Sequence, residues 1–519
     1  MERERLSASR RRRSLRQLSC AATLSALVLA IMPHEAAAQE TNCAPLARPG
    51  QFANTVVSSA QMVAPNPTAK TPAYCEITAV ISPVPRSRIG VIFRLPTTWN
   101  GKLLGYGGGG WAGNVRLTTA ADGLARGYAT LQTDGGHPSP NGGDATWTSP
   151  GGKVDEVALS DFAWRAVHTM TEIGKHAAHM YYGRRHDKAY FQGCSTGGRM
   201  ALIEAQRFPD DYDAIISGAP VYNLRTQLAE IYRDWIFAQP GAAITSAQIA
   251  LVHDAVLASC DITDGVGDGV VGDPKACGFD PAILECKAGQ SGNSCLTSAQ
   301  VTAFRRQYEE VKGTGGITNI FPYTRGSEPG WSQYTNVTAD PVKAAAVRNL
   351  DLRAAMFGDP NFDFAKFDPV RDTTHARSEN FAKYYEADNP DIQPFLAKGG
   401  KLILWHGPDD PAPSPWGTVD YYERVQKAVG PQAASSVRLF LAPGVRHCGG
   451  GPGANTFDLL APLDEWVKHG TAPDRISARR VAPPETPLAP MSRPLCAYPA
   501  RPSYVGNGDV NDERSFVCR

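Results

Sequence analysis

The segment Phe191-Gln192-Gly193-Cys194-Ser195-Thr196-Gly197-Gly198 contains a Gly-x-Ser-x-Gly motif centred on Ser195. Such a motif places a serine on a sharp turn between a strand and a helix, where glycine neighbours avoid side-chain clashes. The preceding residues Lys188–Phe191 are apolar enough for a short buried strand, and the following residues 199–208 fit a helix that ends before Pro209. The context therefore predicts a catalytic Ser195 rather than an ordinary glycine-rich turn.

Strand-like and helix-like patterns alternate on both sides of this motif. Ser160-Asp161 can cap a helix that runs to about Tyr182. Alternation of this kind indicates a mostly parallel sheet with helices on both faces. Together with the serine motif it predicts an α/β class chain with the α/β-hydrolase fold. The expected strands are 89–95, 102–106, 128–134, 188–191, 214–217, 401–405 and 437–441.

The middle of the chain has a different texture. From residue 222 to 398 strand-like runs are missing, and helical segments at 246–258 and 297–311 lie among Gly-, Asp- and Pro-rich loops. We therefore expect an inserted lid domain at 222–398 between two parts of a hydrolase core, at 39–221 and 399–519. The last fifty residues are rich in proline and are expected to wrap the surface.

The N-terminal 38 residues are typical of an export signal. Arg10–Arg13 and Arg16 form a basic region, Cys20–Met32 an apolar region, and Ala36–Ala38 a cleavage site. The segment Ser9–Leu15 can also be interpreted as a twin-arginine signal, and both export routes stay open. The sequence thus predicts a secreted or periplasmic protein, and no other run is long enough to cross a membrane.

Composition limits the classes of partner. The chain has 519 residues, 42% of them hydrophobic, and a formal net charge of +1. This is the composition of a globular protein, and a net charge near zero gives no reason to expect nucleic acid or an anionic membrane surface. The expected partner is a small molecule, and the oligomeric state is not indicated.

The cysteines support export. The chain has 11 cysteines, of which Cys20 would leave with the signal and ten would remain. An even number in an exported chain indicates a set of disulfides, with several free buried thiols as the alternative. Sequence alone does not fix the pairing, but neighbours along the chain suggest Cys260–Cys277, Cys286–Cys295 and Cys496–Cys518.

A serine nucleophile needs a base and an orienting acid, which follow it along the chain in this fold. Two late loops, each directly after an expected strand, supply both groups, and parallel strands bring such loops to one edge of the sheet. His447 is the expected base, with His406 and His137 as alternatives. Asp410 is the expected acid, although the neighbouring Asp409 fits the same description.

The expected nucleophile and the expected base each have a cysteine beside them. Cys194 precedes Ser195, and Cys448 follows His447. If the base and the nucleophile are in contact, these cysteines also lie close together. A Cys194–Cys448 disulfide would then join the two loops and position the pair, although the adjacency can also be a coincidence.

The oxyanion formed during acyl transfer needs hydrogen-bond donors. The backbone N–H of the residue after the nucleophile, Thr196, is one of them. The second comes from an earlier loop after a strand, and Gly107–Gly110 follows the strand that ends at Tyr106. We expect this donor to be Gly109 or Gly110.

The same glycine loop permits a second interpretation. Gly108-x-Gly110-x-x-Gly113 matches a dinucleotide-binding fingerprint, and Asp134 ends a strand about twenty residues later, where a ribose ligand would sit. This oxidoreductase hypothesis leaves the serine motif, the late His-Cys pair and the export signal without a role.

The loop Asp261–Val270 carries three carboxylates and several glycines. Asp261, Asp264 and Asp268 are spaced by three and four residues. Oxygen ligands in a tight loop suit calcium, with the backbone carbonyls of Val266 and Val270 completing the shell. We predict structural calcium here, with a merely polar loop as the alternative; no His/Cys set indicates zinc.

Taken together, these motifs resemble the tannase and feruloyl esterase family. The resemblance covers nearly the whole mature chain and is carried by Gly107–Gly110, the Cys-Ser, Asp and His-Cys set, and the Asp261–Val270 loop. Further matches are Phe208-Pro209, Gly326–Gly330, Pro443–Gly453 and Arg493–Cys496. The resemblance implies a hydrolase core, a lid with structural calcium, and Cys43–Cys75 as a fifth disulfide. It also implies substrates that are esters of aromatic acids, of the feruloyl, galloyl or terephthaloyl monoester type.

The sequence therefore predicts an exported serine esterase that acts through an acyl-enzyme. The alternative is a catalytically inactive, calcium-stabilised binding protein with the same fold, although the Ser, Asp and His are all present. The lid contains aromatic residues that can hold a planar ring by apolar contact. Those named as pocket candidates are Trp331, Tyr334, Phe357 and Phe362.

Overall fold

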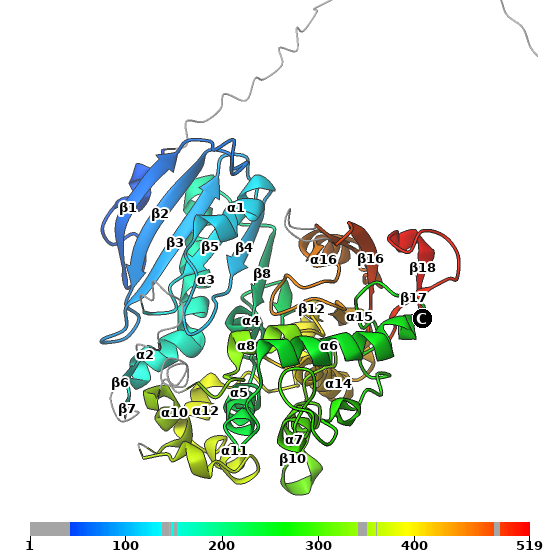
Figure 1. The fold of residues 1–519 in the computed structure, drawn as a ribbon. Coiled ribbons are helices and arrows are strands. Elements are labelled where there is room, and N and C mark those ends of the chain that lie inside the picture. Colours follow the sequence, from blue (N-terminus) through cyan, green and yellow to red (C-terminus); the bar gives the residue numbers. More distant parts are fainter. Residues whose placement is uncertain are drawn as a thin grey trace, which may run out of the picture. The chain divides into compact units, whose positions relative to one another are not determined.

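A mixed sheet organises this computed structural model, which describes residues 42–137, 145, 147–149, 153–340, 350–359, 361–481 and 488–519. Nine strands of these residues form the sheet, and Figure 1 shows the strands side by side. Their spatial order is β1 (Thr55–Val63), β2 (Tyr74–Ile81), β3 (Ile89–Pro96), β5 (Ala129–Thr133), β4 (Lys102–Tyr106), β8 (Lys188–Cys194), β9 (Ala214–Gly218), β12 (Lys401–His406) and β13 (Val437–Leu441). The predicted signal peptide, residues 1–38, lies outside the described residues.

The sheet is parallel where the site residues lie. Strands β5, β4, β8, β9, β12 and β13 pair in parallel, whereas β1, β2, β3 and β5 pair in antiparallel fashion. All seven expected strands are present, and the α/β fold class is confirmed. The sequence analysis missed β1 and β2, which extend the sheet beyond β3 with two further antiparallel strands.

Two hydrophobic cores lie against the faces of the sheet. One contains residues of α3 (Ala166–Tyr182), α4 (Thr196–Arg207) and α14 (Pro415–Val429); the other contains residues of α1 (Leu117–Ala125) and α16 (Leu460–His469). Neighbouring side chains along a strand point to opposite faces, so Leu103 joins the first core and Leu104 the second. This burial on both faces fixes the register of the parallel strands.

The helix expected from Ser160-Asp161 begins earlier. Asp155 caps α2 (Glu156–Ser160), because its carboxylate accepts hydrogen bonds from the amides of Val157 and Ala158. A wider turn over Asp161–Arg165 then leads into α3. The predicted cap was therefore wrong, because the helix begins about one and a half turns earlier, where the Asp155 side chain bonds two of the free amides at the helix start.

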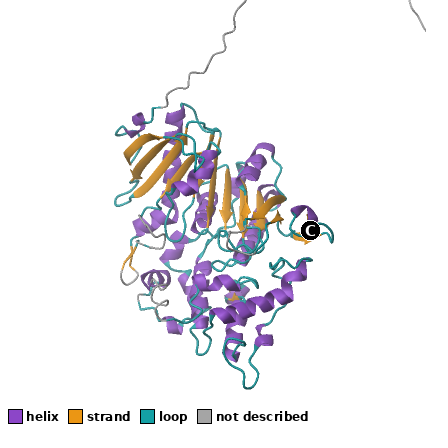
Figure 2. Cartoon of the chain, turned by 45° about the horizontal axis from the view of Figure 1, so that its top comes forward, coloured by secondary structure: helices purple, strands orange, loops and turns teal. Residues whose placement is uncertain are grey.

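Residues 222–398 are the predicted insert, called the insert below, and their described part is mostly helical, as Figure 2 shows. Trp331 is fully buried there and stacks on Tyr323 with ring centroids 5.3 Å apart. Residues 42–519 cluster as one compact unit, and the division into core and lid remains a prediction. The elements of the insert are α5 (Leu224–Phe237), α6 (Ser246–Cys260), α7 (Ser298–Gln307), β10 (Val311–Lys312), β11 (Thr318–Ile320), α8 (Trp331–Tyr334), α10 (Leu350–Phe357), α11 (Arg371–Ala376), α12 (Asn380–Tyr385) and α13 (Gln393–Ala397).

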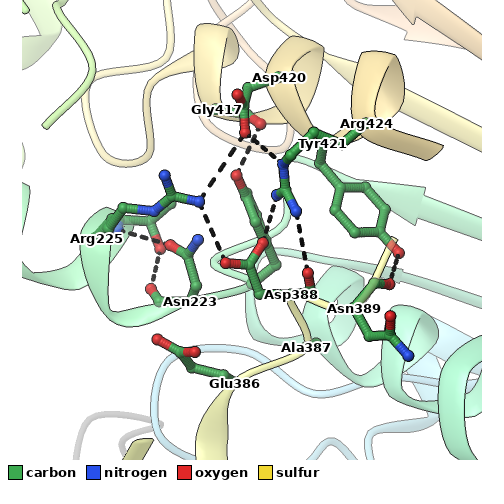
Figure 3. Close-up of polar contacts among 12 residues, drawn as sticks. Asn223, Arg225, Glu386, Ala387, Asp388, Asn389, Gly417, Asp420, Tyr421 and Arg424 are labelled. Atoms are coloured by element: carbon green, nitrogen blue, oxygen red, sulfur yellow. Dashed lines mark hydrogen bonds and ion pairs between the residues drawn. The ribbon is translucent and has the colours of Figure 1, made fainter. Parts of the chain in front are cut away.

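A cluster of buried and partly exposed charges joins both ends of the insert to α14, as shown in Figure 3. Asp388, near the end of the insert, lies 3.2 Å from the guanidinium of Arg225 in α5 and also pairs with Arg424 of α14. Arg424 in turn lies 2.9 Å from Asp420, one turn earlier on α14. Because the Asp388 carboxylate is only 11% exposed, its arginine partners are needed to offset the cost of burying its charge.

The C-terminal segment contains more regular structure than expected. Short strands β14 (Thr456–Phe457), β15 (Arg475–Arg480) and β16 (Met491–Cys496) form one small sheet, and β17 (Pro502–Tyr504) pairs with β18 (Phe516–Cys518). Besides short 3-10 turns, the remaining described elements are the hairpin β6 (Thr148–Ser149) and β7 (Lys153–Val154), and α15 (Pro431–Ser436). Within the described residues, no helix has the length and apolar character needed to span a membrane.

Candidate active site

Ser195 lies on a sharp turn between β8 and α4. Its φ of 62° is in the left-handed region, which a residue with a side chain adopts only under constraint from its surroundings. A Cβ at Gly193 would lie 2.5 Å from the backbone of Gly197, so this position requires glycine. The local sequence thus explains both the turn and the exposure of the hydroxyl at the end of the strand.

The structure brings the predicted base and acid to this serine. The His447 Nε2 lies 2.8 Å from the Ser195 Oγ, and the His447 Nδ1 lies 2.7 Å from the Asp410 Oδ2. Asp410 follows β12 and His447 follows β13, so both loops leave the carboxyl edge of the parallel strands. An alcohol, an imidazole and a carboxylate therefore form one hydrogen-bonded series.

Asp410 is held as an anion. Burial alone would raise its pKa, but the charge of His447 and hydrogen bonds from His406 and His447 lower the pKa to about 2. The His406 Nε2 lies 3.1 Å from the Asp410 Oδ2, and the Ala412 amide donates to the other oxygen at 2.8 Å. The carboxylate is thus fully satisfied and fixed in orientation.

The neighbouring Asp409 has the opposite environment. Burial and the nearby carboxylate of Glu328 raise the pKa of Asp409 to about 7. The structure therefore places Asp410, and not Asp409, against His447. The alternative bases also have other partners: the His406 Nδ1 lies 2.7 Å from the Thr418 hydroxyl, and the His137 Nε2 lies 2.6 Å from the Trp111 carbonyl.

Two acidic residues affect the pKa of His447. Burial opposes protonation of the imidazole, but the Asp410 carboxylate and its hydrogen bond, with a contribution from Glu230, raise the pKa above its ordinary value. Glu230 lies on α5, and burial raises its own pKa to about 7. The sequence analysis missed Glu230, since no local pattern connects an acid in a helical segment with a loop two hundred residues later.

A disulfide links the two loops that meet at the site. Cys194 and Cys448 are bonded, with their Cα atoms 5.9 Å apart and 254 positions apart in the chain. Cys448 also has a positive φ of 59°, so this loop is held in an uncommon conformation. The described residues form the other four predicted disulfides as well: Cys43–Cys75, Cys260–Cys277, Cys286–Cys295 and Cys496–Cys518.

The glycine loop offers one free amide to the site. The Gly109 amide donates to the Ala112 carbonyl at 3.2 Å, so it is already used; this argues against Gly109 as the oxyanion donor. The Gly110 amide donates no hydrogen bond among the described residues, and its carbonyl accepts one from the Thr196 hydroxyl. The Thr196 amide lies in the first turn of α4, where helices leave amides unpaired. Gly110 and Thr196 thus fit the role.

A cavity of about 830 Å³ surrounds the Ser195 hydroxyl. Of the four aromatic residues predicted for the pocket, only Tyr334 lines this cavity, and its ring meets His447 edge-on at 5.6 Å between centroids. The other three pack elsewhere: Trp331 is in the core of the insert, and Phe357 stacks on Phe362 at 3.9 Å. Their prediction as pocket residues gains no support, because apolar packing within the insert buries Trp331 and Phe357 and holds the half-buried Phe362 against Phe357.

The dinucleotide hypothesis also gains no support. The glycine loop lines the cavity around Ser195, and α1 begins only at Leu117, beyond the last glycine of the fingerprint. The Asp134 carboxylate accepts hydrogen bonds from the amides of Gly90 and Gly136, at 3.0 and 2.8 Å. Its oxygen is therefore engaged in local structure.

The loop predicted to bind calcium is tightly folded on itself. The Asp261 carboxylate accepts hydrogen bonds from the amides of Asp268, Gly269 and Val270, and Asp268 pairs with Arg493. Among the described residues, no three His, Cys, Asp or Glu side chains converge as metal ligands. However, a small cavity lies beside Asp264 and Asp268, and the donors are all oxygens, as calcium prefers. The donor chemistry fits the ion, and the calcium site, including the carbonyls of Val266 and Val270, remains a prediction.

The known proteins that this chain resembles include proteins named as hydrolases and esterases. The chain is 34% identical to a mono(2-hydroxyethyl) terephthalate hydrolase of Piscinibacter sakaiensis, with 86% of this chain and 85% of that protein covered. It is 32% identical to a probable feruloyl esterase of Arthroderma benhamiae, over 83% and 82% of the two chains.

Solved structures show the same fold. An esterase from Aspergillus oryzae matches with a TM-score of 0.80 and 26% identity, over 92% of this chain and 99% of that one. Feruloyl esterase B from Aspergillus oryzae matches with a TM-score of 0.78 and 28% identity, over 90% and 97%. The model of the tannase and feruloyl esterase family matches residues 75–519, and the chain therefore belongs to this family.

Proposed function

We propose that this chain is a serine esterase that hydrolyses carboxylic esters of aromatic acids through an acyl-enzyme. The observation that carries the proposal is the hydrogen-bonded series Ser195–His447–Asp410 at the wall of a cavity. The names of the relatives support the substrate class, since they include a feruloyl esterase and a hydrolase of a terephthalate monoester. The proposed acyl group is thus feruloyl, galloyl or terephthaloyl.

In the proposed mechanism, His447 accepts the proton of Ser195 while the serine oxygen attacks the ester carbonyl. The amides of Gly110 and Thr196 stabilise the oxyanion, a contribution that is typically about 3 kcal/mol for one donor. His447 then protonates the leaving alcohol, and a water molecule hydrolyses the acyl-enzyme by the reverse sequence. Asp410 stays ionised throughout and supports the imidazolium, which its strongly lowered pKa favours.

The test compares Ser195→Ala with Ser259→Ala, which changes an exposed serine of α6. Methyl ferulate, methyl gallate and mono(2-hydroxyethyl) terephthalate serve as substrates. We expect Ser195→Ala to lose turnover of whichever ester the wild type accepts, and Ser259→Ala to keep it. Full turnover by Ser195→Ala would show that the nucleophile is assigned incorrectly.

The alternative, an inactive binding protein with this fold, makes a different prediction. An acyl-enzyme mechanism with slow deacylation releases a burst of p-nitrophenol from an activated ester, in proportion to the enzyme concentration. A binding protein would release none above the rate of Ser195→Ala. This single measurement separates the two classes of function.

We further propose that the protein is exported and binds calcium in the Asp261–Val270 loop. The basic and apolar segments within residues 1–38 and the five disulfides support export. Calcium is supported by the oxygen-rich loop, with Asp261, Asp264 and Asp268 as its side-chain ligands. We expect a chelator to lower the melting temperature and added calcium to restore it; an unchanged melting temperature would leave only a polar loop. N-terminal sequencing of the mature protein would locate the cleavage site near Ala38.

A further inference from the structure

A second cavity lies next to the loop of residues 443–453, which carries His447 and is called the His447 loop below. The cavity has a volume of about 300 Å³, at the lower end of typical ligand sites, and neither Ser195 nor His447 lines it. Its walls include Arg446 and residues 450–452 of the His447 loop, and Gly326 and Pro329 of the insert. A molecule bound there would therefore contact both segments at once.

This cavity contains an arginine side chain without a partner. Arg446 lines the cavity and packs against the same loop, since an added Cβ at Gly451 would lie 3.2 Å from the Arg446 Cγ. The guanidinium is half-buried, yet within the described part of the chain it forms no ion pair and no hydrogen bond. Because a guanidinium carries five N–H donors and loses water on burial, Arg446 has donors available for a ligand.

Arg480 adds a second positive charge to the wall of the cavity. Its side chain is buried, with 5% exposed, and donates hydrogen bonds to the Ala489 carbonyl at 2.8 Å and to the Pro452 carbonyl. No carboxylate of the described residues forms an ion pair with Arg480. The two carbonyls satisfy some of its donors but do not neutralise its charge, so the two arginines together favour an anion in the cavity.

The acids near the cavity are already engaged. Glu328 is fully buried and accepts hydrogen bonds from the Gly326 amide at 3.0 Å and from the Tyr308 hydroxyl at 2.6 Å. His253, which lines the cavity, has its Nδ1 3.0 Å from the Glu328 Oε2. Burial opposes protonation of His253, but its hydrogen bond to Glu328 and the charge of that carboxylate raise its pKa. Asp409, the other acid nearby, is driven toward the neutral form by its raised pKa of about 7.

The other walls are backbone amides and apolar side chains. Gly450 and Gly451 line the cavity with φ of 68° and 85°, and their amides donate no hydrogen bond to any described residue. Successive free amides in such a turn form a concavity that attracts anions. Pro329, Pro452 and Leu488 add apolar surface. This combination suits an anion that also carries an apolar group.

We propose that this cavity is a binding site for a small carboxylate with an apolar body, such as an aromatic acid, held by Arg446 and Arg480. A guanidinium matches the two oxygens of a carboxylate, whereas the prolines and Leu488 offer contact to a ring. The ligand would bridge the insert and the His447 loop, and so restrain the segment next to the proposed base. Binding does not depend on the proposed esterase activity, although that activity would release acids of this class.

The experiment measures binding of benzoate by isothermal titration calorimetry at constant ionic strength, with acetate and inorganic phosphate as the other probes. We expect benzoate to bind most tightly, because it alone combines a carboxylate with a ring. Arg446→Gln should weaken benzoate binding about 10- to 100-fold, the range that hydrogen bonds to a charged group support. Arg185→Gln removes the same charge from an exposed arginine that does not line the cavity, and its Kd should equal that of the wild type.

Because the Arg446 side chain has no partner to lose among the described residues, Arg446→Gln without ligand should melt like the wild type. Equal affinity of Arg446→Gln and the wild type for benzoate would overturn the site, since the ligand would then bind elsewhere, as in the cavity at Ser195. Absence of benzoate binding to the wild type would also overturn it. Phosphate that binds more tightly than benzoate would refute the apolar part of the proposal. These titrations need no turnover, so their failure is distinguishable from a failure of the proposed function.

Discussion

Removal of the Cys194–Cys448 disulfide tests whether this bond positions the reacting groups. The double variant Cys194→Ala/Cys448→Ala removes the disulfide that cross-links the segments carrying Ser195 and His447. Both segments hold residues with positive φ, 62° at Ser195 and 59° at Cys448, and the disulfide constrains these conformations from the adjacent positions. We therefore expect the loss to affect the turnover rate more than substrate binding.

The magnitude follows from the length of the closed loop. With 254 positions between the cysteines, the chain-entropy estimate gives about 5.5 kcal/mol of stabilisation at 25 °C, an upper bound in practice. The Cys286–Cys295 disulfide closes a loop of only 9 positions, for which the same estimate gives about 2.6 kcal/mol. For catalysis, a displacement of about 1 Å between serine and imidazole costs on the order of 10²-fold in rate.

The assay measures kcat for methyl ferulate, or for whichever aromatic ester the wild type accepts, together with unfolding by urea. We expect kcat of Cys194→Ala/Cys448→Ala to fall about 100-fold, whereas the control Cys286→Ala/Cys295→Ala keeps kcat and loses only stability. Circular dichroism at the assay temperature shows whether the variant is folded. A folded Cys194→Ala/Cys448→Ala variant with kcat within threefold of the wild type would refute the positioning role.

Three further predictions concern single side chains. Asp410→Asn should reduce kcat/KM on the order of 10⁴-fold, whereas Asp409→Asn should reduce it less than 10-fold; equal losses measured by steady-state kinetics would contradict the assignment. Activity needs a neutral His447, so it falls as the pH drops through the raised pKa of this imidazole. Because Glu230 contributes to the raised pKa, Glu230→Gln should move the acid limb of the kcat/KM profile to lower pH. A limb that stays in place or moves up would show that Glu230 does not act on the imidazole. Asp388→Asn should cost about 3 kcal/mol in urea unfolding, because it removes the nearest anion of the buried Arg225, whereas the partly exposed Arg424 keeps Asp420; a cost below about 1 kcal/mol would mean that the cluster does not anchor the insert.

The sequence was sufficient for the parallel part of the fold because the relevant signals are local. Each of the parallel strands β4, β5, β8, β9, β12 and β13 is a short, largely buried run next to a turn, and burial on both faces requires that pattern. The serine turn is specified by glycines within five residues of one another. The order Ser, Asp, His along the chain then restricts the partners of Ser195 to two loops.

Of the antiparallel strands, β3 was predicted, whereas β1, β15 and β16 were missed because their signals are weaker. The strand β1 at the edge of the sheet exposes much of its surface, including Val56 at 73%, so its sequence lacks a buried stripe. In β15 the buried and exposed positions alternate, but Arg475, Arg479 and Arg480 give the segment a polar composition. The strand Met491–Cys496 contains a proline, which argues against a strand when only local propensity is considered.

The choice between Asp409 and Asp410 shows where sequence reasoning ends for the candidate site. The two residues have the same side chain and share one turn, so no local property distinguishes them. Their environments come from different parts of the chain: Asp410 contacts His406 and His447, whereas Asp409 faces Glu328 of the insert. One carboxyl is therefore kept ionised with a pKa of about 2, and its neighbour is driven toward the neutral form with a pKa of about 7. Since Asp410 is both ionised and in contact with the imidazole, whereas Asp409 makes no contact with it among the described hydrogen bonds, it is the tertiary structure that makes Asp410 the residue able to orient His447.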